Sequence, residues 1–356
     1  MFLENDKLVM ERVVYLLGAG FSVPFGIPVV RNFLERSKDL CFRDRDKYAH
    51  FSGVFDTIRE LSVCKNYYSI DLFNIEDILS LLEMRAGLAG EEEIRKNFVR
   101  YIADVIQAYT PSNPGPTEGQ HWSNTIFGPE PWNLYGPFVT TILNRPFKKI
   151  MERKHPNSIE YDPIDPEPRP TEYAVITLNY DIMLESLAND LNNWFGKEKA
   201  FRRQFEHRPE EGGFNGYLAK LHGSVDSGEI VPPTWNKHLV KGDILKAWQI
   251  AHWLLASANH VRVIGYSLPD ADNYIKYLLR AAVVHNPHLK TFDVLCLDLD
   301  GSVRKRYDEF IHFPNHRFLS MSVERYLQHH LDCFEHWPEM AGVDKLERAH
   351  DGLFSG

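Results

Sequence analysis

The sequence predicts an α/β fold in which helices cover both faces of a parallel sheet. Short, continuous apolar runs recur along the chain, as expected for parallel strands that are buried on both faces. Helix-length segments separate these runs, an alternation that is typical of βαβ units. Each run ends at a glycine or a polar residue, at the strand end where such sheets bind ligands. We therefore expect a Rossmann-like, doubly wound parallel sheet with a helical insertion.

Five runs have the character of strands: Val13–Leu17, Ala174–Leu178, Gly216–Leu221, Val261–Ile264 and Val294–Leu297. They predict one domain over residues 10–320, whose sheet comes from residues 10–30 and 171–320. The remainder of that range, residues 31–170, is the predicted insertion. Residues 321–356 are expected to form a C-terminal helical tail.

The predicted insertion has two parts. Residues 31–109 are mostly helical by pattern, with one apolar face formed by Ile75, Ile78, Leu79 and Leu82. Residues 110–170 hold 12 of the 21 prolines. Their run Asp162–Pro170 can be neither a helix nor a central strand, so it predicts a surface loop that leads back to the sheet.

Composition and charge exclude several classes of protein. The 356 residues are 44% hydrophobic and 25% charged, which excludes a mainly disordered chain, a collagen and a coiled coil. The net charge is −9, from 40 Lys+Arg against 49 Asp+Glu. Broad electrostatic capture of nucleic acid or of anionic lipid is therefore not expected.

Cysteine usage and the N-terminus point to the cytoplasm. Cys41, Cys64, Cys296 and Cys333 lie far apart and form no C-x-x-C pair, so no zinc or other metal site is expected. Four cysteines in a chain of this length do not indicate a disulfide-stapled secreted fold. Residues 1–12 lack the features of a signal peptide, and no run of about 18 apolar residues predicts a membrane span.

Two motifs follow the first two predicted strands. In Gly18-Ala19-Gly20-Phe21-Ser22, the glycines let the backbone approach a pyrophosphate, whose charge N–H groups at a helix start can hold. Val23 stands in place of the usual third glycine, so a plain tight turn is the alternative. In Thr177–Asp181, the Asn179 amide can face a ribose or a water with Asp181 supporting it, or the pair can cap the next helix.

Two further motifs follow the third and fourth strands. His222 ends a strand and precedes Gly223, which would leave room for a ligand beside the ring. Imidazole, with an ordinary pKa of ~6.5, can act as a general base, although most histidines are surface or core residues. Gly265 and Ser267 form a small pair that would face a nucleotide. Ser267 is not read as a hydrolase nucleophile, because no second glycine follows it.

The segment Leu297–Ser302 is similar to the start of a haloacid-dehalogenase phosphatase. Only 56 residues follow Asp300, too few for the lysine and aspartates that this family carries well downstream. The D-x-D-x-D-G spacing of a calcium loop is also missing. We interpret Asp298 instead as the end of a late strand that borders an adenosine pocket.

Taken in order, the motifs G-A-G-x-S with G-I-P, T-x-N-Y-D, K-L-H-G-S and G-Y-S-L-P resemble the sirtuin-like superfamily. They look most like its bacterial NAD hydrolase branch, known from antiphage defence. The resemblance covers residues 10–320 and includes Asn74–Leu79 and Val231–Trp235.

The chain departs from the protein-deacylase sirtuins in two respects. It lacks their zinc-binding cysteine pairs. It also carries Val29 and Val30 where their G-I-P-D-F-R motif has Asp and Phe, although Arg31 is kept. Both departures point away from deacylation and leave NAD binding intact.

The resemblance implies that NAD lies across the carboxyl edge of the sheet as the substrate. Asn179, His222 and Asp181 would be catalytic: Asn179 positions the attacking water, His222 polarises a ribose hydroxyl or water, and Asp181 orients both. The reaction would cleave the bond to nicotinamide through an oxocarbenium-like transition state and yield ADP-ribose. The implied NAD-binding residues are Gly18, Ala19, Gly20, Phe21, Ser22, Pro28, Arg31, Gly223, Gly265, Ser267 and Asp298.

Other activities and several partners also follow from the resemblance. The alternatives are ADP-ribosylation or NAD-dependent deacylation of a protein, and a sensor module that binds NAD or ADP-ribose without catalysis. Because an unregulated NAD hydrolase would be toxic, an off state is expected. We therefore expect a homo-oligomer or a separate activator, for example an ATPase or a phage component.

Overall fold

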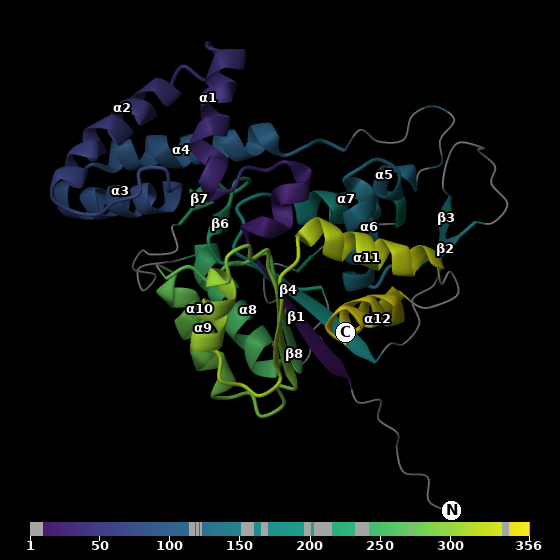
Figure 1. Ribbon diagram of the computed structural model, residues 1–356. Helices are drawn as coiled ribbons and strands as arrows, with labels where there is room; N and C mark the ends of the chain where they lie inside the picture. The colour runs from purple at the N-terminus through teal and green to yellow at the C-terminus, as the bar shows by residue number, and fades with distance from the viewer. Residues whose placement is uncertain are drawn as a thin grey trace, which may run out of the picture.

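A six-stranded parallel sheet forms the centre of the computed structural model (Figure 1). Its order is β10-β9-β8-β1-β4-β5, which confirms the predicted fold class. The strands are β1 Glu11–Leu17, β4 Thr171–Thr177, β5 Leu218–Lys220, β8 His260–Ile264, β9 Thr291–Leu295 and β10 His316–Leu319. The structure describes residues 10–113, 118, 121, 123–150, 160–164, 170–195, 201–202, 216–231, 242–270, 272–336 and 342–355.

The strand order places β1 at the point where the winding of the sheet reverses. β1 pairs with β4 on one side and with β8 on the other, both in parallel. Ligands of doubly wound sheets bind beyond the carboxyl ends of the strands at such a point. A ligand site is therefore expected at the loops that follow β1, β4 and β8.

Helices cover both faces of the sheet because successive strand residues point to opposite sides. In β1, Val13, Tyr15 and Leu17 belong to one hydrophobic core, and Val14 and Leu16 belong to the other. Helices α6 Trp132–Ile142, α7 Met183–Phe195, α11 Val323–His336 and α12 Gly342–Phe354 contribute to the first core. Helices α8 Gly242–Ser257, α9 Asn273–Val283 and α10 Ser302–Phe310 cover the opposite face.

Four helices form a bundle at one side of the sheet (upper left in Figure 1). They are α1 Phe33–Arg43, α2 Phe51–Leu61, α3 Ile75–Ala89 and α4 Glu92–Tyr109. The predicted apolar face of α3 is buried, with Ile78 and Leu79 fully covered. Asn74 caps this helix, since its side chain accepts hydrogen bonds from the N–H groups of Glu76 and Asp77.

The remaining elements are short. They are η1 Ala19–Phe25, η2 Val30–Asn32, η3 Ser62–Asn66, α5 Asn124–Phe127 and the strands β2 Phe147–Lys149, β3 Tyr161–Pro163, β6 Gly223–Ser224 and β7 Glu229–Ile230. The predicted loop Asp162–Pro170 begins within β3, and its residues 165–169 lie outside the described residues. Within the described residues, the structure contains no helix that is long and apolar enough to cross a membrane.

Strand β10 was not predicted, and several observed strand ends differ from the predicted ones. The run Val294–Leu297 was expected to be a strand, but β9 ends at Leu295 and Leu297 is exposed. The expected strand Gly216–Leu221 is paired in the sheet only over Leu218–Lys220. All four residues of β10 are half-buried, so this edge strand lacks the continuous apolar run by which the others were recognised.

The C-terminal helix α12 is held on the sheet by an ion pair between a buried arginine and a partly buried glutamate. Arg262 in β8 is 2% exposed, and its guanidinium makes two hydrogen bonds of 2.7 and 2.8 Å to the carboxylate of Glu347 in α12. Tyr15 and Tyr173 complete the group: Tyr15 accepts from Arg262, and Tyr173 donates to Glu347. The predicted tail thus packs into the same core as the sheet.

A second set of charges extends this contact toward the edge of the sheet. Asp293 in β9 receives two hydrogen bonds of 2.6 and 2.7 Å from Arg317 in β10. Its carboxylate also lies 3.2 Å from Nε2 of His350 in α12.

Candidate active site

The strand register brings the four sequence motifs to one edge of the sheet. Leu17 at the end of β1 is opposite both Thr177 in β4 and Ile264 in β8. Thr177 is in turn opposite Lys220 at the end of β5. Asn179 comes two residues after Thr177, and His222 comes two residues after Lys220. Because Thr177 and Lys220 are paired, Asn179 and His222 follow neighbouring strands at the same height along the sheet.

The glycines of the first motif allow the loop after β1 to pack closely against the loop after β8. A side chain at Gly18 would place its Cβ 2.5 Å from Cβ of Tyr266, and one at Gly20 would meet the backbone of Gly265. Gly265 itself has a φ of +68°, and its carbonyl accepts the Gly20 N–H at 2.9 Å. The Phe21 N–H is bonded to Gly18. The Gly18 N–H donates to the Ile264 carbonyl at 3.0 Å, so three N–H groups of this motif are used within the protein. The neighbouring Ala19 is exposed.

Ser22 lies in a buried hydrogen-bonded group rather than on the surface. It is 2% exposed, and its hydroxyl donates to Oδ2 of Asp181 at 2.7 Å. The same hydroxyl accepts from Nδ2 of Asn179 at 3.0 Å. The expectation that Ser22 holds the pyrophosphate directly does not fit this geometry, because its hydroxyl already joins the loop after β1 to the loop after β4.

The orientation of the Asn179 amide follows from its partners. Its Nδ2 donates to the main-chain carbonyl of Gly18 and to Ser22, both at 3.0 Å. The Gly18 carbonyl can only accept, so the NH₂ group must face it. The amide oxygen of Asn179 consequently points away from these two partners. Since Asn179 is only partly buried, this oxygen can accept a hydrogen bond from a ligand or a water.

Asp181 joins the site to helix α7. Its Oδ1 accepts the N–H of Met183, the first residue of that helix, at 3.2 Å. The helix-cap role considered for this aspartate is therefore present, alongside its bond to Ser22. The main-chain carbonyl of Asp181 also accepts a hydrogen bond from the Lys220 ammonium. The sequence motif K-L-H-G-S includes Lys220, but no role was predicted for it. Its charge within an otherwise apolar strand could have marked it as a residue with buried partners.

His222 is buried directly beyond β5. It is 3% exposed, and its ring centroid lies 6.1 Å from that of Tyr180. Its carbonyl accepts the Val231 N–H at 2.9 Å. Gly223 was expected to leave room for a ligand, but a Cβ there would meet the Glu229 carbonyl at 1.9 Å. Gly223, with a φ of +87°, is thus required by the β6–β7 hairpin.

Two tyrosines of the quoted motifs, Tyr180 and Tyr266, lie beside these residues, and the motifs predicted no role for them. The Tyr266 hydroxyl donates to Asp272 at 2.7 Å. Burial raises the pKa of Tyr180 well above its ordinary value, and the negative charges of Glu76 and Asp272 add to this effect. Burial and the same two carboxylates raise the pKa of Tyr266. Both hydroxyls therefore stay protonated at neutral pH.

The residues predicted to bind adenosine have structural partners of their own. The Asp298 carboxylate accepts the N–H groups of Val303 and Arg304 at 3.2 and 3.0 Å, so it stabilises the start of α10. The Ser267 carbonyl accepts from the Arg306 guanidinium. Of the two residues predicted from the G-I-P motif, Pro28 is buried and Arg31 is exposed.

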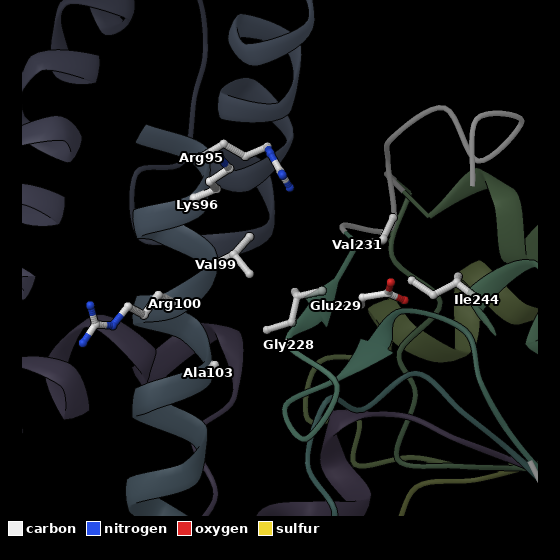
Figure 2. Close-up of a pocket in the computed structure, with 10 residues that line it drawn as sticks. Arg95, Lys96, Val99, Arg100, Ala103, Gly228, Glu229, Val231 and Ile244 are labelled. Atoms are coloured by element: carbon white, nitrogen blue, oxygen red, sulfur yellow. The ribbon is translucent and has the colours of Figure 1, made fainter. Parts of the chain in front are cut away.

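A cavity of about 600 Å³ lies between the helical bundle and the sheet domain. Figure 2 shows Val99 of α4 on one side and Gly228, Val231 and Ile244 on the other. The predicted site residues do not line it, but Val231 links it to His222 through the backbone. Beyond Val231, the rest of the predicted segment Val231–Trp235 lies outside the described residues.

The described residues contain no group of three or more His, Cys, Asp or Glu side chains placed to hold a metal ion. All four cysteines are free thiols; Cys41 and Cys64 are partly exposed, and Cys296 and Cys333 are buried.

No protein-family model matches the chain, and no curated protein is similar to it. Among solved structures, the chain is similar to Sir2Tm bound to a propionylated peptide, with 13% identity, a TM-score of 0.38, and 91% of this chain and 92% of that chain covered. It is also similar to SIR2 in complex with the inhibitor EX-527, 2′-O-acetyl-ADP-ribose and a deacetylated p53 peptide. There the identity is 14%, the TM-score 0.31, and the coverage 91% and 93%. Because these TM-scores are low, the function has to be inferred from the residues of the site.

Proposed function

We propose that the chain is an NAD glycohydrolase, which cleaves NAD to nicotinamide and ADP-ribose. The observation that carries this proposal is the fixed amide of Asn179, whose oxygen is left to accept a hydrogen bond at the carboxyl edge of the sheet. His222 leaves the neighbouring strand at the same level. The order of the four motifs, which resembles that of the sirtuin-like NAD hydrolases, supports NAD as the substrate.

The proposed chemistry needs little acid catalysis, because nicotinamide leaves as a neutral molecule from a cationic ring. An oxocarbenium-like transition state forms at the ribose, and water attacks it. The Asn179 oxygen would accept a hydrogen bond from that water, and His222 would polarise it or a ribose hydroxyl. Asp181 would hold Asn179 in place through Ser22.

The rest of NAD would lie along the same edge. Ala19, the exposed residue of the first motif, would contact the pyrophosphate, since the N–H groups of its neighbours are already bonded. The remaining predicted contacts are Gly265, Ser267 and Asp298 at the adenosine end and Pro28 and Arg31 near the nicotinamide. Because the net charge is −9, these contacts must hold an anionic ligand through local groups rather than through the overall field.

We further propose a cellular role that follows from this activity. The enzyme would deplete NAD in the cytoplasm as an effector of bacterial antiphage defence. It would be held inactive until it assembles with further copies of itself or with an activating protein.

The direct test is incubation of the chain with NAD in the isolated, assembled and partner-bound states, following nicotinamide and ADP-ribose. Wild type should release both in equal amounts, and His222→Ala should reduce the rate by about 10²–10⁴-fold. An acetylated peptide in a parallel reaction distinguishes deacylation, which would yield deacetylated peptide and an acetylated ADP-ribose. ADP-ribose binding without NAD cleavage, in isolated, assembled and partner-bound states, would leave the sensor alternative and exclude the hydrolase.

A further inference from the structure

Lys220 is a charged residue within an otherwise apolar strand. It lies at the end of β5 and is 4% exposed. A buried ammonium is costly unless it has partners. Its Nζ lies 3.0 Å from Oε1 of Glu185, in the first turn of α7, and also donates to the main-chain carbonyl of Asp181. These two acceptors explain how the charge is tolerated.

The contact with Asp181 falls within the loop that connects β4 to α7. The same loop is held by the Val225 N–H, which donates to the Tyr180 carbonyl at 2.9 Å. It is also held by the Met183 N–H, which donates to the Asp181 carboxylate. From that carboxylate, hydrogen bonds continue through Ser22 to Asn179. Lys220 therefore lies at the other end of a continuous set of contacts from the Asn179 amide.

The position of Lys220 in the sheet gives this contact a second consequence. Lys220 is two residues before His222, and its opposite residue in β4, Thr177, is two residues before Asn179. The ammonium thus connects the end of β5, two residues before His222, to the loop that carries Asn179. These contacts therefore connect the two segments that carry Asn179 and His222.

We propose that Lys220 and Glu185 are a positioning pair for the NAD cleavage proposed above, on which this inference rests. Neither residue touches the substrate; Lys220 acts through Asp181, and Glu185 holds Lys220. An ammonium suits this role because its three N–H groups can bond two acceptors that lie in different directions. A methionine at this position keeps similar length and loses both contacts.

The experiment compares Lys220→Met and Glu185→Gln with wild type. Lys246→Met is the matched control, because Lys246 forms an exposed ion pair with Asp243 on α8. Two properties are measured: the kinetics of NAD cleavage, and hydrogen exchange of the Met183 and Val225 amides. A misplaced catalytic group can reduce turnover by about 10²-fold, so Lys220→Met should lower kcat by about 10–100-fold with KM within about threefold of wild type.

Hydrogen exchange distinguishes positioning from general stability. Lys220→Met should speed exchange at Met183 and Val225 by about tenfold, with the Val263 amide in β8 unchanged. Glu185→Gln keeps the size and one acceptor oxygen, so both effects should be smaller but present. Lys246→Met should change neither property.

The inference is overturned if a folded Lys220→Met protein exchanges like wild type at Met183 and Val225. It is also overturned if exchange rises equally at Val263, which indicates general destabilisation. If Lys220→Met does not fold, the exchange rates of the Met183 and Val225 amides in Glu185→Gln provide the same test. Absence of NAD cleavage by wild type in the isolated, assembled and partner-bound states would contradict the proposed function, while the exchange measurement would still decide the positioning claim.

Discussion

Two buried polar groups in this molecule use their hydrogen bonds differently. The edge cluster, formed by Ser22, Asn179, Asp181 and Lys220, lies where strands end and leaves the Asn179 oxygen directed away from its partners. The α12 network, formed by Arg262, Asp293, Arg317, Glu347 and His350, lies along the strands under the C-terminal helix. Its charges are paired with one another.

This difference distinguishes a candidate ligand site, the edge cluster, from a structural contact, the α12 network. In the α12 network, polar groups that pair mainly with one another hold α12 on the sheet. The edge cluster also joins loops, but it presents a side chain with a fixed direction. Damage to the α12 network should therefore lower stability first, and damage to the edge cluster should lower activity first.

The largest effect on stability is expected from Glu347→Ala. Burial disfavours the charged form of Glu347, but the Arg262 guanidinium outweighs this and lowers the pKa of Glu347 to about 2. Removing the carboxylate leaves Arg262 buried without its partner, which should reduce the free energy of unfolding by about 3–5 kcal/mol. Denaturant unfolding at pH 7 measures this loss.

Two control variants make that measurement specific. Glu309→Ala removes an exposed partner of Lys305 and should cost less than about 1 kcal/mol. Arg262→Met combined with Glu347→Leu removes both charges and should recover much of the loss. A Glu347→Ala protein within about 1 kcal/mol of wild type would show that the α12 network does not fasten the helix.

A smaller effect concerns pH and the helices beside the network. Burial, aided by Lys345, lowers the pKa of His330 to about 3, and burial followed by Arg262 lowers the pKa of His350 to about 4. Between pH 6.5 and 5, the unfolded chain therefore binds protons that the folded chain does not. As the pH is lowered through this window, the free energy of unfolding therefore decreases by about 2 kcal/mol for each histidine.

His330→Phe should remove one of these two contributions. Its ring packs edge-on against Phe138, so phenylalanine fits the same contact. The variant should lose about 2 kcal/mol less than wild type between pH 6.5 and pH 5 in denaturant unfolding. His288→Gln, at an exposed position, should follow wild type. Equal losses in wild type and His330→Phe would contradict the assignment.

The fold was largely predictable because five strands are buried on both faces. Such strands appear as continuous apolar runs, as in Val13–Leu17, without knowledge of their neighbours. The half-buried edge strand β10 gave no such signal. The packing of α12 was also missed, since Arg262 and Glu347 are 85 residues apart and nothing in either local sequence indicates the other.

The candidate site was predictable only in part. Strand ends located Asn179 and His222, because parallel strands bring their carboxyl ends to one edge. The partners of Ser22 and Gly223 within the protein could not be predicted, since Asp181 and Glu229 reach them only through tertiary contacts. Glu185 was not predicted, because it lies on a helix whose placement only the fold determines.

The most direct test of the central claim is the rate of nicotinamide release from NAD by Asn179→Ala and His330→Phe, measured in parallel with wild type. The claim is that the carboxyl edge of the sheet is the site of NAD cleavage. Asn179→Ala should then lower kcat by about 10²-fold, since it removes the group that positions the water. His330→Phe should stay within about threefold of wild type. An Asn179→Ala protein that cleaves NAD at the wild-type rate would contradict the account.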